Sequence, residues 1–109
     1  MPKKDEYSKY LPLSESTYYI LLALVEPLHG YGIMQKVESL SNGMVKIGPG
    51  TLYGAFTTLE KEKLITKVSE IDRRKTYSLT SKGKTVLSRQ IERIEMMLNH
   101  GVQVKSFLV

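Results

Sequence analysis

The segment "IGPGTLYG" combines small residues and hydroxyl side chains in a pattern that would let an anion approach the backbone. Pro49 suits the first position of a helix, because its missing N–H is not needed there. Gly50 and Thr51 add little bulk beside the free N–H groups of such a helix end, which favour phosphate. The hydroxyls of Thr51 and Tyr53 suit phosphates and base edges. We therefore predict a helix N-terminus that is open to a phosphate.

Three consecutive basic residues, Arg73, Arg74 and Lys75, form a second candidate anion site. They follow "LITKVSE" and precede "TYSLT", two stretches that alternate in polarity as strands do, so they should lie at the tip of a β-hairpin over residues 65–79. Cations at such a tip suit phosphates, and arginine suits the minor groove of DNA. A solvated basic turn is the alternative interpretation.

The distribution of charge along the chain also points to an anionic partner. The 109 residues carry a net charge of +5, and residues 61–93 hold ten Lys or Arg against four Asp or Glu. A local basic field is typical of a nucleic-acid surface, although an anionic membrane or an acidic protein would be attracted as well.

Nothing in the residue pattern indicates catalysis, a cofactor or a metal site. The chain has no cysteine, and His29 and His100 are too far apart for a zinc motif. Glu60 and Glu62 have no serine or histidine partner, so we interpret them as surface charges of a helix. The longest apolar run, residues 18–25, is far shorter than the roughly 20 residues of a membrane span. We expect a single-domain cytoplasmic protein that is neither an enzyme nor bound to a membrane.

Apolar periodicity predicts three helices ahead of the hairpin. The first covers residues 14–25 with Ser14 as its N-cap, the second covers 33–40, and the third covers about 49–63. The turn "EPLHGYG" separates the first two helices. Within this turn we assign structural roles to His29 and Tyr31, with Tyr31 packing and Gly30 supplying an unusual backbone angle.

Three helices followed by a hairpin give the order of a winged helix-turn-helix, a mainly α fold with a small β-hairpin. In this architecture the third helix enters the major groove and the hairpin forms a wing beside it. Positions of the third helix that lie away from its apolar stripe can meet DNA, together with the wing tip. The candidate DNA-binding residues are Gly50, Thr51, Tyr53, Gly54, Thr57, Lys61, Arg73, Arg74 and Lys75. The alternative is that Thr51 only caps the helix and Tyr53 only packs on the hairpin.

A fourth helix, capped by Thr80, is predicted after the wing, and its apolar residues have the spacing of a coiled-coil seam. Such a stripe is too apolar to remain exposed to water on a small domain, so we predict that it is buried against the first helix and against the second copy of a homodimer. The candidate dimer-interface residues are Leu87, Ile91, Ile94, Met97 and Leu98. Gly101 leaves open whether the tail continues the helix or folds back. The expected organisation is an N-terminal arm (1–12), a winged helix-turn-helix domain (13–80) and a C-terminal dimerisation helix with its tail (81–109).

Four motifs carry a family resemblance: "PLHGYGI", "GPGTLYGAF", "LEKEKLI" and "RRKTYSLTSKG". In order and spacing they resemble the PadR family of bacterial transcriptional regulators, over about residues 13–86. With one helix after the wing, the chain resembles the short type of this family. The resemblance implies a homodimeric repressor of a pseudo-palindromic operator. It also implies that a small hydrophobic effector could enter an apolar cleft between the two chains.

Two positions depart from the family pattern. Gly48 replaces a serine found in many members, which costs the helix only a few tenths of a kcal/mol but removes a hydroxyl that could reach a phosphate. The wing tip "IDRRK" keeps the basic charge but lacks the Gly-Arg-Pro-like turn common in the family. The alternative function is a winged-helix module that binds another protein instead of specific DNA.

Overall fold

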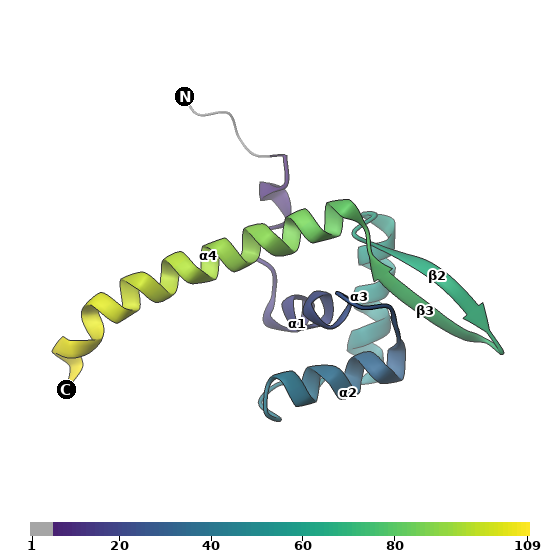
Figure 1. The fold of residues 1–109 in the computed structure, drawn as a ribbon, viewed down its shortest axis with the longest axis horizontal. Helices are drawn as coiled ribbons and strands as arrows, with labels where there is room; N and C mark the ends of the chain where they lie inside the picture. The colour runs from purple at the N-terminus through teal and green to yellow at the C-terminus, as the bar shows by residue number, and fades with distance from the viewer. Residues whose placement is uncertain (1–5) are drawn as a thin grey trace.

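The computed structural model describes residues 6–109, so the first five residues of the predicted N-terminal arm lie outside the described residues. Helices dominate the fold, and a small antiparallel sheet carries the hairpin that projects from one end (Figure 1). This confirms the predicted class, a mainly α winged helix-turn-helix followed by a long helix. The elements are η1 (Ser8–Tyr10), α1 (Glu15–Ala23), β1 (Leu28–His29), α2 (Gly30–Leu40), α3 (Pro49–Lys61), β2 (Ile65–Ile71), β3 (Arg74–Leu79), α4 (Ser81–Lys105) and η2 (Ser106–Leu108).

Local sequence signals explain how α1 and α3 begin and end. Ser14 caps α1 as predicted, because its hydroxyl accepts a hydrogen bond from the Thr17 N–H at 3.1 Å. Helix α3 starts at Pro49 but ends at Lys61, two residues before the predicted end. The reason is that Lys63 takes a left-handed conformation (φ 61°), and the Leu64 N–H donates to the Leu59 carbonyl at 2.9 Å. This hydrogen bond closes the helix as a Schellman motif does.

The sheet has three strands in the order β1-β3-β2, where the sequence predicted only the β2–β3 hairpin. Strand β1 pairs Leu28 with Tyr77 and His29 with Thr76, and α2 begins immediately after it at Gly30, ahead of the predicted start at Ile33. A two-residue strand has no periodicity, so sequence patterns could not reveal it. Its pairing ties the α1–α2 connection to the wing.

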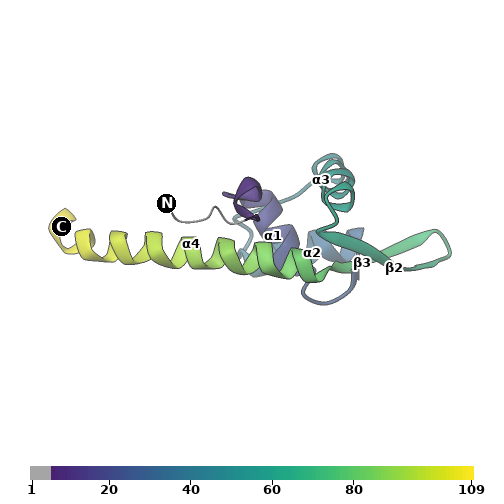
Figure 2. The same cartoon turned by 90° about the horizontal axis from the view of Figure 1, so that it is seen from above.

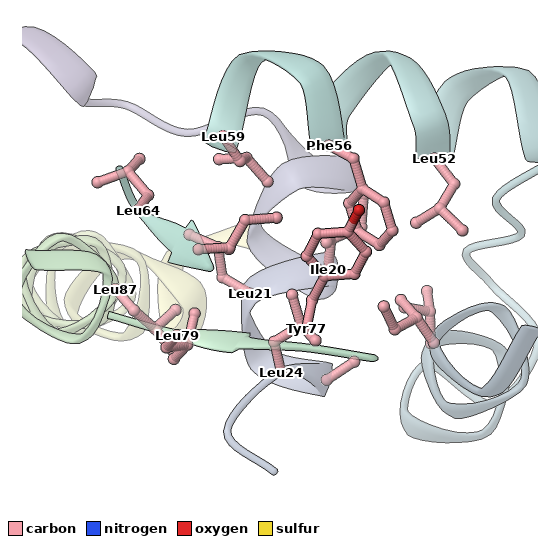
Figure 3. Packing of buried hydrophobic residues seen from close by; sticks show 14 of the residues in the cluster. Ile20, Leu21, Leu24, Leu52, Phe56, Leu59, Leu64, Tyr77, Leu79 and Leu87 are labelled. Atoms are coloured by element: carbon pink, nitrogen blue, oxygen red, sulfur yellow. The ribbon is translucent and has the colours of Figure 1, made fainter. Parts of the chain in front are cut away.

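The core lies between α1, α3 and the inner face of the sheet (Figure 3). Ile20 and Leu21 of α1 are fully buried and face Phe56 and Leu59 of α3. The apolar stripe predicted for the third helix is therefore the face that packs inward. Burying one such side chain contributes about 1.5–3 kcal/mol.

The start of α4 rests on the connection between α3 and β2. Thr80 caps α4 as predicted, because its hydroxyl accepts from the Gly83 N–H at 3.0 Å and donates to the Lys63 carbonyl at 2.6 Å. Gly83 lies so close to this connection that a Cβ there would overlap the Leu64 carbonyl oxygen. Glycine is required at this position by close approach, not by its backbone angle.

The part of the N-terminal arm that the structure describes packs on these same elements. The Tyr10 hydroxyl donates to the Glu62 carboxylate at 3.1 Å, and the Lys82 ammonium lies 4.9 Å from the centre of the Tyr10 ring. The Leu13 N–H donates to the Gln90 side-chain oxygen at 3.1 Å, which satisfies a buried amide. The arm therefore joins the C-terminal end of α3 to the first turns of α4.

Helix α4 continues through Gly101 to Lys105, which settles the question of the tail in favour of a continuous helix. Its C-terminal half extends past the other helices, and every residue from 91 to 109 is exposed (Figure 2). In the described part of the chain, no helix combines the length and apolarity that crossing a membrane would require.

Candidate nucleic-acid interface

Helix α3 presents a polar face on the side opposite its buried stripe. All six candidate residues on this helix, Gly50, Thr51, Tyr53, Gly54, Thr57 and Lys61, are exposed. The Thr57 hydroxyl donates to the Tyr53 carbonyl at 3.0 Å. A hydroxyl has one hydrogen to donate, so Thr57 offers a ligand its methyl group and its acceptor lone pairs.

The N-terminus of α3 has no side-chain cap. Gly48 is the N-cap residue with an extended backbone (φ −84°, ψ 166°), and Pro49 takes the first helical position as predicted. A Cβ at Gly48 or Gly50 would meet nothing within 4 Å, so the approach to the first-turn N–H groups is open. These N–H groups and the helix dipole favour an anion.

The wing carries its cations at the tip. Asp72 and Arg73 form the two-residue turn with φ values of 51° and 65°, as a type I′ turn requires, although neither is glycine. Arg74 and Lys75 follow at the start of β3, where Arg74 pairs with Ile71 and Lys75 with Glu70. All three predicted cations are exposed.

A groove of about 560 Å³ lies between the wing, α3 and the first turn of α2. We call it the wing groove. It brings the candidate residue Tyr53 together with the three wing cations. Its lining residues are His29, Gly30, Tyr31, Tyr53, Phe56, Asp72, Arg73, Arg74, Lys75 and Tyr77.

The remaining candidates on α3 lie outside the wing groove. Gly54 lines a separate hollow of about 420 Å³, where it faces Tyr10 and Pro12 of the arm. Lys61 lies in the last turn of the helix and Thr51 in the first. The predicted set is therefore spread along one helix face instead of converging on one pocket, as suits contact with an extended ligand.

Two residues of the wing groove were assigned other roles by the sequence analysis. Tyr31 was expected to pack, but its side chain is 63 % exposed at the groove. Gly30 was expected to supply an unusual backbone angle, but it has no positive φ. Its role is close approach, because a Cβ there would lie 3.0 Å from the Tyr53 hydroxyl oxygen. The motif "PLHGYGI" was the only feature of the sequence that could have marked Gly30 and Tyr31 as residues of this groove. The β1–β3 pairing that brings them to the wing produces no recognisable sequence pattern.

The floor of the wing groove is apolar and neutral. Phe56 and Tyr77 are buried there, with ring centres 4.6 Å apart. Burial raises the pKa of the Tyr77 phenol, and the adjacent Glu60 carboxylate raises it further. Glu60 is exposed, as predicted for a surface charge, whereas Glu62 is half-buried and accepts the hydrogen bond of the Tyr10 hydroxyl. Within residues 6–109, no three acidic or histidine side chains gather as metal ligands would.

The apolar stripe of α4 divides at Gln90. Leu87 is 6 % exposed and belongs to the chain's own core, which agrees with the expected burial of the stripe against the first helix and leaves little of this residue for a second copy. Ile91, Ile94, Met97 and Leu98 are all exposed. The seam that a partner could cover therefore begins at Ile91.

The sequence model of the Transcriptional regulator PadR-like family matches residues 10–89. The chain belongs to this PadR-like family. By the description of the family, its members are transcriptional regulators. Family membership favours this function over the alternative of a protein-interaction module.

Individual proteins also resemble the chain in sequence or structure. The chain is 36 % identical over 78 residues to an uncharacterized 37.1 kDa protein in transposon TN4556 of Streptomyces fradiae, covering 71 % of this chain and 22 % of that protein. It is 32 % identical over 69 residues to the transcriptional regulator YqjI of Escherichia coli, covering 63 % and 33 %. The match thus spans about a fifth and a third of these two relatives. A PadR-like transcription factor of Bacteroides fragilis has a similar structure, with a TM-score of 0.67 and 29 % identity over 91 % of this chain and 97 % of that one.

Proposed function

We propose that this protein is a homodimeric repressor that recognises a pseudo-palindromic operator through α3 and the wing. The observation that carries the proposal is the continuity of the exposed face of α3 with the basic wing tip, which meet at the wing groove. In a winged helix-turn-helix, this arrangement lets the third helix enter the major groove while the wing contacts the DNA beside it.

We expect two kinds of contact with the operator: contacts to phosphates, which position the protein, and contacts to bases, which read the sequence. The uncapped N-terminus of α3 and the cations Arg73, Arg74 and Lys75 suit phosphates, which position the protein without distinguishing sequences. Thr51, Tyr53 and Thr57 lie where side chains can meet base edges or the methyl group of thymine. Arg73 at the tip also suits a narrow minor groove.

The proposed dimer rests on the second half of α4. This segment exposes the apolar residues Ile91, Ile94, Met97 and Leu98, and a second copy would remove them from water. A dimer also doubles the phosphate contacts and can place two α3 helices about 34–36 Å apart, in successive major grooves. A small hydrophobic effector that enters between the two chains would shift the spacing of these helices and release the operator.

The test begins with selection of fragments of the source genome on the immobilised protein, followed by affinity measurements on the enriched site and a scrambled duplex. Affinity for the site should fall by orders of magnitude as salt rises from about 50 to 200 mM. Transcription in vitro from the enriched promoter should decrease when the protein is added. Failure to bind any duplex at low salt would leave the protein-interaction module as the better hypothesis, and increased transcription would indicate an activator.

A further inference from the structure

We propose that the wing groove holds a phosphate of the operator backbone and that Tyr31, in the first turn of α2, donates a hydrogen bond to it. This inference rests on the proposed function and adds a third element, α2, to the DNA interface. From the sequence alone, DNA contacts are expected only on α3 and the wing.

The chemistry of the groove suits a phosphate on a sugar–phosphate strand. The groove is lined by Tyr31 and Tyr53, which are 63 % and 57 % exposed, and by Arg73 and Lys75 from the wing. Hydroxyl donors and cations that line the same hollow can both bind the oxygens of an anion, and hydrogen bonds to charged groups are the stronger kind. The buried floor of Phe56 and Tyr77 offers an apolar surface on which a deoxyribose can pack.

The position of Tyr31 relative to the wing is fixed by backbone pairing. His29, two residues before Tyr31, is paired with Thr76, the residue that follows Lys75. On the neighbouring side, Gly30 allows the Tyr53 hydroxyl to lie directly against the start of α2. The backbone positions of Tyr31 and Lys75 are thus fixed relative to each other before any ligand arrives, which avoids the cost of ordering flexible segments.

The location of the groove favours DNA over a free anion as its ligand. A strand that passes from the exposed face of α3 to the wing tip must cross this hollow, because the hollow lies between the two elements. The acidic groups in the vicinity are Asp72 at the wing tip and Glu60 and Glu70 near Tyr77. Of these three carboxylates only Asp72 is among the lining residues of the groove, where Arg73, Arg74 and Lys75 outnumber it, so the lining attracts a phosphate.

The decisive variant is Tyr31→Phe in the full-length protein, which removes one hydroxyl from an exposed ring. We expect about a 5- to 20-fold loss of affinity, by a similar factor on operator and scrambled duplex, because the contact is to the backbone. Tyr19→Phe is the matched control, since it removes the same group from a tyrosine on α1 outside the groove, and it should leave affinity unchanged. The melting temperature of both variants should match that of the natural protein.

A methylphosphonate scan of the operator locates the contact. Replacing single phosphates with the neutral analogue should reveal one position beside each α3 half-site where Tyr31→Phe loses less affinity than the natural protein loses. Equal losses for the two proteins at every position would overturn the proposal, as would operator affinity unaffected by Tyr31→Phe. An Arg73→Ala variant separates this failure from failure of the proposed function: if Arg73→Ala still weakens binding, the recognition of DNA by α3 and the wing stands and only the role of Tyr31 is lost.

Discussion

The two halves of α4 belong to different environments although one apolar pattern runs through both. In the first half, Gly83, Val86, Leu87 and Gln90 are buried against the chain's own core. In the second half every residue is exposed. The spacing of apolar residues is the same on both sides of Gln90. It therefore indicates that this face of the helix packs against something, but not whether the same chain or a second one covers it. Two predictions test this division, and two test the wing and the connection on which α4 rests, from the largest expected effect to the smallest.

Ile91→Asp combined with Ile94→Asp should convert the proposed dimer into monomers that remain folded. Each isoleucine is expected to contribute about 1.5–3 kcal/mol where it is buried, so the dissociation constant should rise at least about 1000-fold. Sedimentation velocity measures the change, and circular dichroism checks that helical content persists. Arg93→Asp is the control, since this exposed residue lies off the seam. Dimers that survive the double substitution would show that the interface lies elsewhere.

Gly83→Ala and Gly101→Ala place the same methyl group on the two halves of α4. At Gly83 the methyl would collide with the Leu64 carbonyl, and we expect unfolding to become easier by about 3 kcal/mol. At Gly101 it would meet nothing within 4 Å of the single chain, so a monomeric variant should gain up to about 1 kcal/mol of helix stability. Urea denaturation measures both. Equal effects would contradict the division at Gln90.

Replacing Arg73, Arg74 and Lys75 with alanine tests the wing without touching α4. Affinity for any duplex should fall about 10- to 100-fold at moderate salt, and the salt slope should become shallower by up to about one unit per lost phosphate contact. Fluorescence anisotropy across a salt series gives both quantities. Lys105→Ala, which removes a cation from the far end of α4, should leave the slope as it was. An unchanged slope in the triple variant would rule out phosphate contacts by the wing.

Lys63→Gly should stabilise the connection on which α4 rests. Lys63 has a φ of 61°, a conformation that glycine adopts without steric cost. Relief of this cost is partly offset by the greater freedom of glycine in the unfolded chain, so we expect a gain of about 0.5 kcal/mol. Thermal unfolding should detect it, with Lys61→Gly, inside α3, as a destabilised control. A loss of stability in Lys63→Gly would mean that the lysine side chain has a contact of its own.

Much of the fold followed from the sequence because local signals agree with it. Ser14 and Thr80 cap helices, Pro49 opens α3, and the stripe of Leu52, Phe56 and Leu59 faces inward. These features depend on neighbours within a few residues, which a periodic pattern records. The motif-based family assignment succeeded for the same reason, since its four motifs mark the turns and caps of the fold.

The rest depended on contacts between distant segments. Nothing near Gly30 in the sequence indicates that the Tyr53 hydroxyl will lie against it, and nothing near Gly83 indicates the Leu64 carbonyl. Tyr31 was misassigned because its exposure follows from where β1 places the start of α2. Periodicity predicts that the α4 stripe packs on the first helix and on a second copy, but it cannot tell which residues meet which partner, so Leu87 was placed in the dimer interface as well. The DNA-binding and dimer-interface residues remain predictions that the experiments above can test.

The pairing of β1 with β3 has a consequence for how the chain folds during synthesis. The backbone of Leu28 cannot pair until Tyr77, about fifty residues later in the chain, has been synthesised. Closing so long a loop is slow relative to forming a helix, so α1, α2 and α3 can form and collide before the wing is anchored. We therefore expect the wing groove to be among the last features to assemble on the ribosome. A nascent chain that ends before β3 should form its helices but should not bind DNA.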